Sequence, residues 1–196
     1  MKAVLKHTVK KQFNKSNPVK NVRVLDFIDT LTKWQSIPEM WESLSAAYEN
    51  IVAVSDPYRE GAVQYTYSEL VSKMKTFASG IQKLGLKAGD KVSIFSENSH
   101  KWLIADQGTM MAGCINAVRG SSAPVDELDY ILRHSESSAL VVEDQATYNK
   151  LKPYLKDLDL KFVAILWNKG EIEEHDFDFP VLSFESLLFI GSESEY

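Results

Sequence analysis

The chain has 196 residues, of which 44% are hydrophobic, 11% aromatic and 25% charged. This composition is typical of globular proteins and excludes a disordered or fibrous chain. The length suits one substantial domain and is short for two. Nine glycines fall below the average of about 7%, so little glycine is available for a loop that binds phosphate through backbone amides.

The net charge of −5 is unevenly distributed along the chain. Residues 1–25 carry seven basic and no acidic side chains, a charge of +7, which leaves −12 for the remainder. A basic arm can contact an anionic membrane surface, and a solvated N-terminal segment has the same composition. The acidic remainder argues against nucleic-acid binding. We therefore expect a basic N-terminal arm over 1–35, with peripheral membrane contact as one role, and an α/β subdomain over 36–196.

The sequence shows no secretory signal and no membrane-spanning stretch, which favours the cytoplasm. The start of the chain lacks the apolar core of a secretory signal. No stretch has the roughly 18 uninterrupted apolar residues of a spanning helix. The single cysteine, Cys114, permits no intramolecular disulfide and fits a reducing compartment. These features predict a cytoplasmic protein that is soluble or peripherally bound to a membrane.

Capping-box motifs begin two helices in the first half of the chain, one at Ser36 and one at Thr66. Gly85 follows the second helix as a C-terminal cap. The apolar patterns predict, in chain order, a helix over 36–49, a strand over 51–54, a strand over 62–66 and a helix over 66–84.

Strands and helices alternate in the second half. The pattern predicts strands over 91–96, 114–118, 139–142 and 162–167, and helices over 99–112, 124–134 and 145–155. Such alternation predicts a mostly parallel sheet with helices on both faces, and right-handed crossovers make it a doubly wound α/β sheet. After Gly170 we expect an acidic loop over 171–178 and a short apolar helix over 183–190.

Glycine-based nucleotide motifs are missing. No two glycines are separated by a single residue, which excludes a dinucleotide fingerprint. The pairs Gly80/Gly85 and Gly108/Gly113 have the glycine spacing of a P-loop, but the required Lys and Ser or Thr do not follow. Each pair also falls inside or at the end of a predicted helix, whereas a phosphate loop precedes one.

Nucleophilic and metal sites have little support. Cys114 could act as a nucleophile with a histidine base, but its place in an apolar strand predicts a buried core residue. No serine lies in a nucleophile elbow. Metal sites need clustered ligands, whereas the four histidines are scattered, so we expect structural or surface roles for them: His7, His100, His134 and His175.

Polar side chains gather at the predicted carboxyl ends of the strands, where doubly wound sheets bind ligands. They are Ser96, Glu97, Asn98, Arg119, Glu143 and Asp144. Helix capping accounts for part of this set, with Asn98 or Ser99 and Ser122 as natural caps. Arg119 stands between an apolar strand and a Gly-Ser-Ser turn, so it is the candidate for holding a carboxylate or phosphate.

Several segments together resemble the N-terminal portion of the adenylate-forming acyl-activating enzymes. They are 65–70 (YTYSEL), 84–92 (LGLKAGDKV), 96–99 (SENS) with Trp102, 111–113 (MAG), and 134–137 (HSES) before 139–142 (ALVV). The segment 118–124 (VRGSSAP) is similar to the long-chain acyl-acyl-carrier-protein synthetases of cyanobacteria and plastids, relatives of the long-chain fatty acyl-CoA synthetases. The resemblance covers roughly residues 38–190.

The resemblance implies a two-step reaction, in which a fatty acid and ATP give an acyl-adenylate and the thiol of acyl carrier protein or coenzyme A then takes the acyl group. Mg²⁺, a glycine-rich phosphate loop, a later acidic motif and a C-terminal lysine serve this chemistry in the family. None of these motifs is present here, so the resemblance assigns no catalytic, cofactor-binding or metal residue. We expect a truncated, incomplete form of the acyl-activating fold that binds no cofactor and is inactive alone.

Two other functions remain open at this point. One is a non-enzymatic α/β interaction or regulatory module derived from the family, and the other is a small nucleotide-binding protein that relies on Arg119. We also expect self-association, because the apolar helix over 184–190 would lack the partners that the rest of the enzyme supplies.

Overall fold

The computed structural model describes residues 34–57, 62–168, 170, 172 and 176–193. The chain divides into two units, and the boundary between Met40 and Trp41 falls inside helix α3 (Ile37–Ala47). The predicted arm over 1–35 lies outside the described residues except for its last two, so it stays a prediction. At the start of α3 the amide of Glu39 donates to Ser36 Oγ at 3.3 Å, which is the predicted cap.

Two short strands form an antiparallel hairpin. Strand β1 (Val52–Asp56) pairs with β2 (Val63–Thr66), and the register shifts between Val52 and Val54. Both strands begin one residue after the predicted start. Strand β2 ends at the predicted residue, whereas β1 runs to Asp56 and was predicted to end at Val54.

The main sheet has five parallel strands in the order β4-β3-β5-β6-β7. They are β3 (Lys91–Phe95), β4 (Ile115–Arg119), β5 (Ala139–Asp144), β6 (Val163–Trp167) and β7 (Val181–Ser183). The first four confirm the predicted parallel sheet. Strand β7 was not predicted, because three residues are too few to show a periodic pattern.

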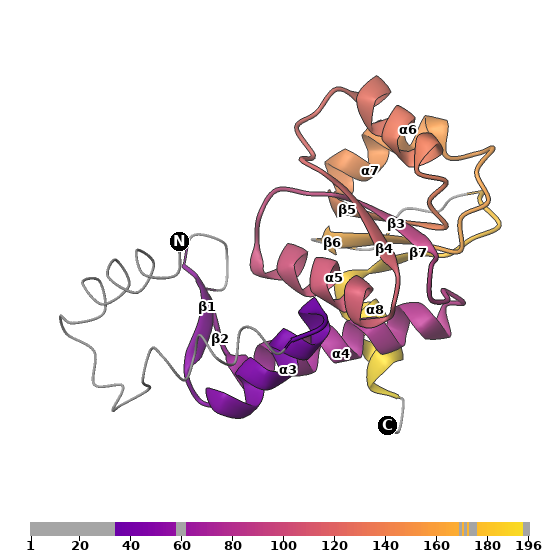
Figure 1. Ribbon diagram of the computed structural model, residues 1–196. Coiled ribbons are helices and arrows are strands. Elements are labelled where there is room, and N and C mark those ends of the chain that lie inside the picture. The colour runs from indigo at the N-terminus through magenta and orange to yellow at the C-terminus, as the bar shows by residue number, and fades with distance from the viewer. Residues whose placement is uncertain (1–33, 58–61, 169, 171, 173–175, 194–196) are drawn as a thin grey trace, which may run out of the picture. The chain divides into compact units, whose positions relative to one another are not determined.

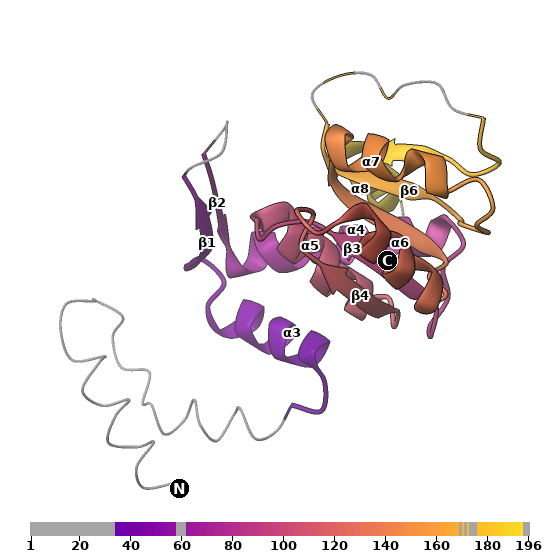
Figure 2. The same cartoon turned by 90° about the horizontal axis from the view of Figure 1, so that it is seen from above.

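Helices cover both faces of this sheet, which confirms the doubly wound α/β fold. Figures 1 and 2 show α4 (Tyr67–Lys83), α5 (His100–Met111) and α8 (Phe184–Ser192) on one face, with α6 (Val125–His134) and α7 (Gln145–Leu151) on the other. A 3₁₀ turn, η1 (Lys152–Tyr154), ends the predicted helix over 145–155. In the described segments, no helix combines the length and apolar character needed to cross a membrane.

Each face of the sheet has its own hydrophobic core. Val92 and Ile94 of β3 point into the core beneath α4, α5 and α8, whereas Phe95 points into the core beneath α6 and α7. The alternation along β3 follows from the period of two in a strand. Near-continuous apolar strands of this kind are expected when both faces of a parallel sheet are covered.

Helix α4 packs between α5 and α8 through glycines. A Cβ atom on Gly80 would lie 2.6 Å from the Leu187 carbonyl oxygen, and one on Gly108 would lie 2.8 Å from that of Met74. Gly85 and Gly113 end their helices with φ of +95° and +76°, a backbone conformation that L side chains rarely adopt. The two glycine pairs with P-loop spacing therefore serve helix packing and helix termination.

Helix α8 is partly covered by its own chain. Phe184 and Leu187 are buried in the core with α4, so these two side chains have partners within this chain, contrary to the prediction. Phe189 is 65% exposed. The apolar surface left for the predicted self-association is thus smaller than the sequence of this helix indicated.

Candidate functional site

The candidate site is the carboxyl edge of the main sheet at the point where the strand order reverses. The chain passes from β3 to β4 on one side and returns to β5 on the other side of β3. Ligands of doubly wound sheets bind in the crevice at such a reversal. Here the amide of Glu97, just after β3, donates to Glu143 Oε2 of β5 at 3.3 Å. A hydrogen bond of the chain itself thus spans this crevice.

Both glutamates also hold the loop that follows β4. Glu97 Oε1 accepts from the Ser122 hydroxyl at 3.0 Å and from its amide at 3.4 Å. Glu143 Oε2 accepts a hydrogen bond from the Ser121 hydroxyl. A Cβ atom on Gly120 would lie 2.8 Å from Glu97 Oε1, so glycine allows the close approach of this carboxylate.

Lys150 of α7 also binds this loop, through its carbonyl groups. Its Nζ donates to the Ala123 carbonyl at 2.5 Å and to the Ser121 carbonyl at 3.4 Å. We call Glu97, Glu143 and Lys150 with the loop over 120–123 the loop clamp. The structure therefore brings together two of the predicted strand-end residues, Glu97 and Glu143, and their carboxylates bind groups of the chain itself.

Arg119 lies at the same edge but is directed to another carboxylate. Its Nε donates to Glu127 Oε1 of α6 at 2.6 Å, and its side chain is 47% exposed. The bond to Glu127 raises the pKa of the Arg119 guanidinium above its usual range, and the charge of Glu97 adds to this effect. The negative charges of Glu127 and Glu97 near this guanidinium weaken its attraction for a phosphate.

Helix capping explains other members of the predicted set. Ser99, not Asn98, caps α5, because its Oγ accepts from the Trp102 amide at 3.0 Å. Asp144 caps α7 by accepting from the Thr147 amide at 2.8 Å. The prediction that Ser122 caps α6 was wrong: Pro124 holds the N-cap position, and Ser122 belongs to the loop clamp.

Cys114 is a core residue, as predicted. The cysteine is buried just before β4, and its Sγ lies 3.4 Å from the Lys87 carbonyl oxygen. Burial raises the pKa of the thiol, and a raised pKa reduces the thiolate needed for nucleophilic attack.

The described histidines have structural contacts. His100 is buried, its Nδ1 lies 3.0 Å from Asp56 Oδ2, and its ring packs edge-on against Tyr65 and Trp167. His134 stacks on Tyr130 at 5.2 Å between ring centroids. Within the described ranges, no three His, Cys, Asp or Glu side chains are grouped to hold a metal ion, and His7 and His175 lie outside those ranges.

Two polar centres were missed in the sequence. Lys101 of α5 lies 4.6 Å from the Trp167 ring centroid, and its Nζ donates to Glu185 Oε1 at 2.5 Å. The contact joins residues 84 positions apart, so no local pattern could indicate it.

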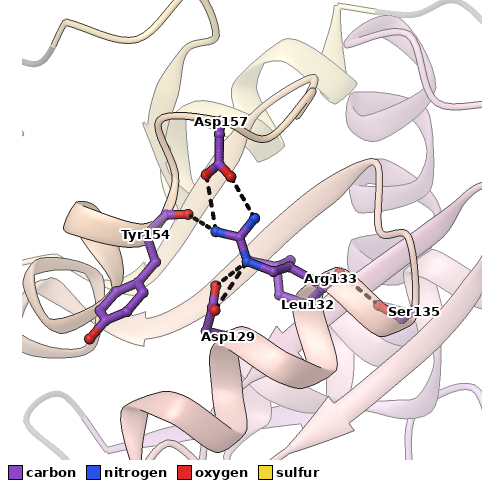
Figure 3. Close-up of polar contacts among 6 residues, drawn as sticks. All are labelled: Asp129, Leu132, Arg133, Ser135, Tyr154 and Asp157. Atoms are coloured by element: carbon purple, nitrogen blue, oxygen red, sulfur yellow. Dashed lines mark hydrogen bonds and ion pairs between the residues drawn. The ribbon is translucent and has the colours of Figure 1, made fainter.

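Arg133 forms the second centre, which Figure 3 shows. Its guanidinium donates to both carboxylate oxygens of Asp157, at 2.8 and 3.0 Å, and to the Tyr154 carbonyl at 2.9 Å. Asp129, one helical turn earlier, also accepts from Arg133, at 2.8 Å. Of these contacts, only the i, i+4 pair of Asp129 and Arg133 has a spacing that indicates it in the sequence. The hydrogen bonds from the Arg133 guanidinium lower the pKa of Asp157.

The comparison with known families matches residues 41–180 to the AMP-binding enzymes. This chain belongs to the AMP-binding enzyme family. Over 165 residues it is 36% identical to the long-chain-fatty-acid–[acyl-carrier-protein] ligase AEE15, chloroplastic, of Arabidopsis thaliana. It is also 37% identical over 163 residues to probable acyl-activating enzyme 16, chloroplastic, of the same plant. The resemblance stated from the sequence is thereby confirmed.

The match covers most of this chain but little of its relatives. It takes in 83% of the chain and 23% of AEE15, so the chain spans about a quarter of the length of that AMP-binding relative. Solved structures agree in fold: a putative long-chain-fatty-acid CoA ligase of Rhodopseudomonas palustris gives a TM-score of 0.64 at 18% identity, with 78% of this chain and 36% of that one covered.

A second solved structure shows the same fold. The fatty acyl-adenylate ligase of L. pneumophila gives a TM-score of 0.61 at 20% identity, over 84% of this chain and 26% of that chain. At this level of identity the likeness establishes the architecture of the AMP-binding N-terminal region and carries nothing about substrate.

Proposed function

We propose that this chain is the N-terminal α/β part of an ATP-dependent ligase for long-chain fatty acids. In such a ligase the carboxylate attacks ATP to give an acyl-adenylate and pyrophosphate, and a thiol of acyl carrier protein or coenzyme A then takes the acyl group and releases AMP. The observation that carries the proposal is the 36% identity with AEE15 over most of the chain. Between acyl carrier protein and coenzyme A, the name of this relative favours acyl carrier protein.

The proposed role of the chain within the ligase is to provide framework and not reacting groups. At the strand-order reversal Glu97 and Glu143 accept hydrogen bonds from the loop over 120–123. Arg119 donates to Glu127. We therefore propose that the 196-residue chain alone does not form acyl-adenylate. Groups that bind ATP and Mg²⁺ would come from the part of the ligase that this chain does not span.

The test is ATP–pyrophosphate exchange driven by a long-chain fatty acid. Two proteins are compared: the 196-residue chain, and a chimera in which its residues 41–193 replace the aligned segment of AEE15. Unaltered AEE15 is the positive control. We expect exchange by the chimera within about tenfold of AEE15, and none above background by the chain alone.

Each result bears on a separate part of the proposal. Exchange by the chain alone would overturn the statement that it is inactive. A chimera that is folded by circular dichroism yet shows no exchange would overturn the ligase role. That result would favour the alternative of a non-enzymatic interaction module derived from the family.

A further inference from the structure

The ends of helices α4 and α8 meet at the amino edge of the main sheet, where the parallel strands begin. Lys83 Nζ, at the end of α4, donates to the Ile190 carbonyl near the end of α8 at 2.8 Å. Helix α4 then leads through a short loop to Lys91, the first residue of β3. Figure 1 shows α8 crossing α4, with the end of α8 at the bottom of the view.

Apolar side chains reach solvent at the end of α8. Phe189 is 65% exposed, more than any other large apolar side chain that the structure describes, and its neighbours Leu188 and Ile190 are half-buried. Close packing on α4 holds this turn in place, because a Cβ atom on Gly191 would lie 1.9 Å from the Thr76 carbonyl oxygen. One exposed aromatic ring is ordinary on a protein surface, so its charged surroundings decide what it contacts.

The surroundings of Phe189 begin with a basic stretch of the chain. Residues 70–89 contain four lysines and no acidic residue, although the chain beyond residue 25 carries a net charge of −12. Two of these lysines, Lys83 and Lys87, are exposed at the end of α4 and in the loop after it. Positive charge thus gathers beside the apolar end of α8.

Acidic side chains at the amino edge are mostly neutralised by other lysines. Asp90 accepts from Lys161 Nζ at 2.7 Å, and Glu136 accepts from Lys91 Nζ at 3.0 Å. Glu193, the C-cap of α8, follows the apolar turn. The two lysines at the end of α4 outnumber this one carboxylate.

The opposite, carboxyl edge of the sheet has the reverse charge. Around the candidate site the acidic side chains Glu97, Glu127, Glu143 and Asp144 outnumber the basic side chains Arg119 and Lys150. An anionic surface therefore attracts the amino edge and repels the carboxyl edge. The charge distribution selects one orientation on such a surface.

We propose that the end of α8 and the lysines beside it contact the surface of an anionic lipid bilayer. Phe189 would enter the boundary between head groups and acyl chains, and Lys83 and Lys87 would contact lipid phosphates. This inference rests on the proposed function, because a long-chain fatty acid partitions into bilayers and the contact would hold the ligase beside its substrate. One aromatic ring with two lysines gives weak, reversible binding.

A bilayer suits this surface better than a second copy of the chain. In a two-fold dimer centred on Phe189, the same basic surface of both copies would come together, and like charges facing each other oppose association. A stable dimer also buries about 800 Å² on each partner, whereas a bilayer accepts a single apolar side chain without a complementary shape.

The test is partition of the 196-residue chain onto vesicles of equal parts phosphatidylglycerol and phosphatidylcholine, measured by co-sedimentation. Phe189→Ser should lower the partition coefficient by about tenfold, and Lys87→Gln by about fivefold. Tyr130→Ser is the matched control, because Tyr130 is 61% exposed on α6, on the other face of the sheet, and it should change nothing. The basic segment over 1–25 is the same in every variant, so its own attraction for the vesicles cancels from these ratios.

The contrary results are distinct. Equal partition of the Phe189→Ser and Tyr130→Ser variants, both folded by circular dichroism, would overturn the inference. Lys87→Gln without effect would overturn the electrostatic part, as would equal binding of the unaltered chain to pure phosphatidylcholine vesicles.

Two further measurements separate the other occupants of this surface. Self-association without vesicles that Phe189→Ser abolishes would make a second copy the occupant. If Phe189→Ser leaves the partition of the AEE15 chimera unchanged, the rest of the ligase covers Phe189 and the inference fails. Pyrophosphate exchange by the chimera, measured without vesicles, tests the proposed function separately.

Discussion

The substitution Gly191→Ala tests how closely α8 packs against α4. A Cβ atom at this position would lie 1.9 Å from the Thr76 carbonyl oxygen, and Thr76 is in the middle of α4. A carbon atom approaches a carbonyl oxygen no closer than about 3.3 Å. Helix α8 must therefore move away by about 1.4 Å. The last turn cannot shift freely, because Lys83 Nζ donates to the Ile190 carbonyl at 2.8 Å.

The magnitude follows from what this movement uncovers. Phe184 and Leu187 are 4% and 0% exposed beneath α8. A gap of about 0.5–1 Å already removes a quarter to a half of a dispersion contact. Losing the burial of both side chains costs about 3–6 kcal/mol, at ~1.5–3 kcal/mol each. Alanine regains about 1 kcal/mol of helix propensity over glycine, so we expect a net loss of about 2–5 kcal/mol.

The assay is urea unfolding of the 196-residue chain, followed by circular dichroism. Gly170→Ala is the matched control, because its Cβ atom would meet nothing within 4 Å and should change stability by less than about 0.5 kcal/mol. If Gly191→Ala changes stability no more than this control, α8 does not pack on α4 as closely as described.

Three further substitutions or reactions test local features. Thr66→Ala removes the Oγ1 that accepts from the Glu69 amide at 3.2 Å and should lower stability by about 1 kcal/mol in urea unfolding, while Thr66→Ser should restore it. Arg133→Met removes the partner that lowers the pKa of Asp157. A lowered pKa stabilises the fold above the unfolded-state pKa, so the deficit of this variant should be present at neutral pH and shrink as the pH falls through the folded-state pKa of Asp157; a deficit independent of pH would contradict this. The buried thiol of Cys114 should react with a thiol reagent at least 100-fold faster in urea than in buffer, and equal rates would show that it is accessible.

The elements that sequence predicted are those with local signals. The Thr66–Glu69 capping box and the apolar stripe of α4 depend on residues three or four positions apart, so the helix could be placed to within one residue. The order of the strands depends on which face each crossover helix covers, and this is set by packing over the whole sheet. The sequence therefore predicted a parallel sheet but not that β4 is its edge.

The candidate site was predicted in position but not in chemistry. Sequence placed Glu97 and Glu143 at the carboxyl ends of strands, and both are there. Their partners Ser121 and Ser122 come from a third loop, and Lys150 comes from a helix on the opposite face of the sheet from α5. Long-range contacts of this kind decide whether a polar residue awaits a ligand or already has a partner, and they leave no spacing in the sequence.

Hydrogen bonds hold strand β4 in place at both of its ends. The clamp fixes residues 120–123, which follow β4 directly, through Glu97, Glu143 and Lys150. At its other end β4 is tied by the Ile115 amide to Asp90. The glutamates at the strand-order reversal thus hold the end of β4 and the loop after it in place, which supports the framework role proposed for this chain.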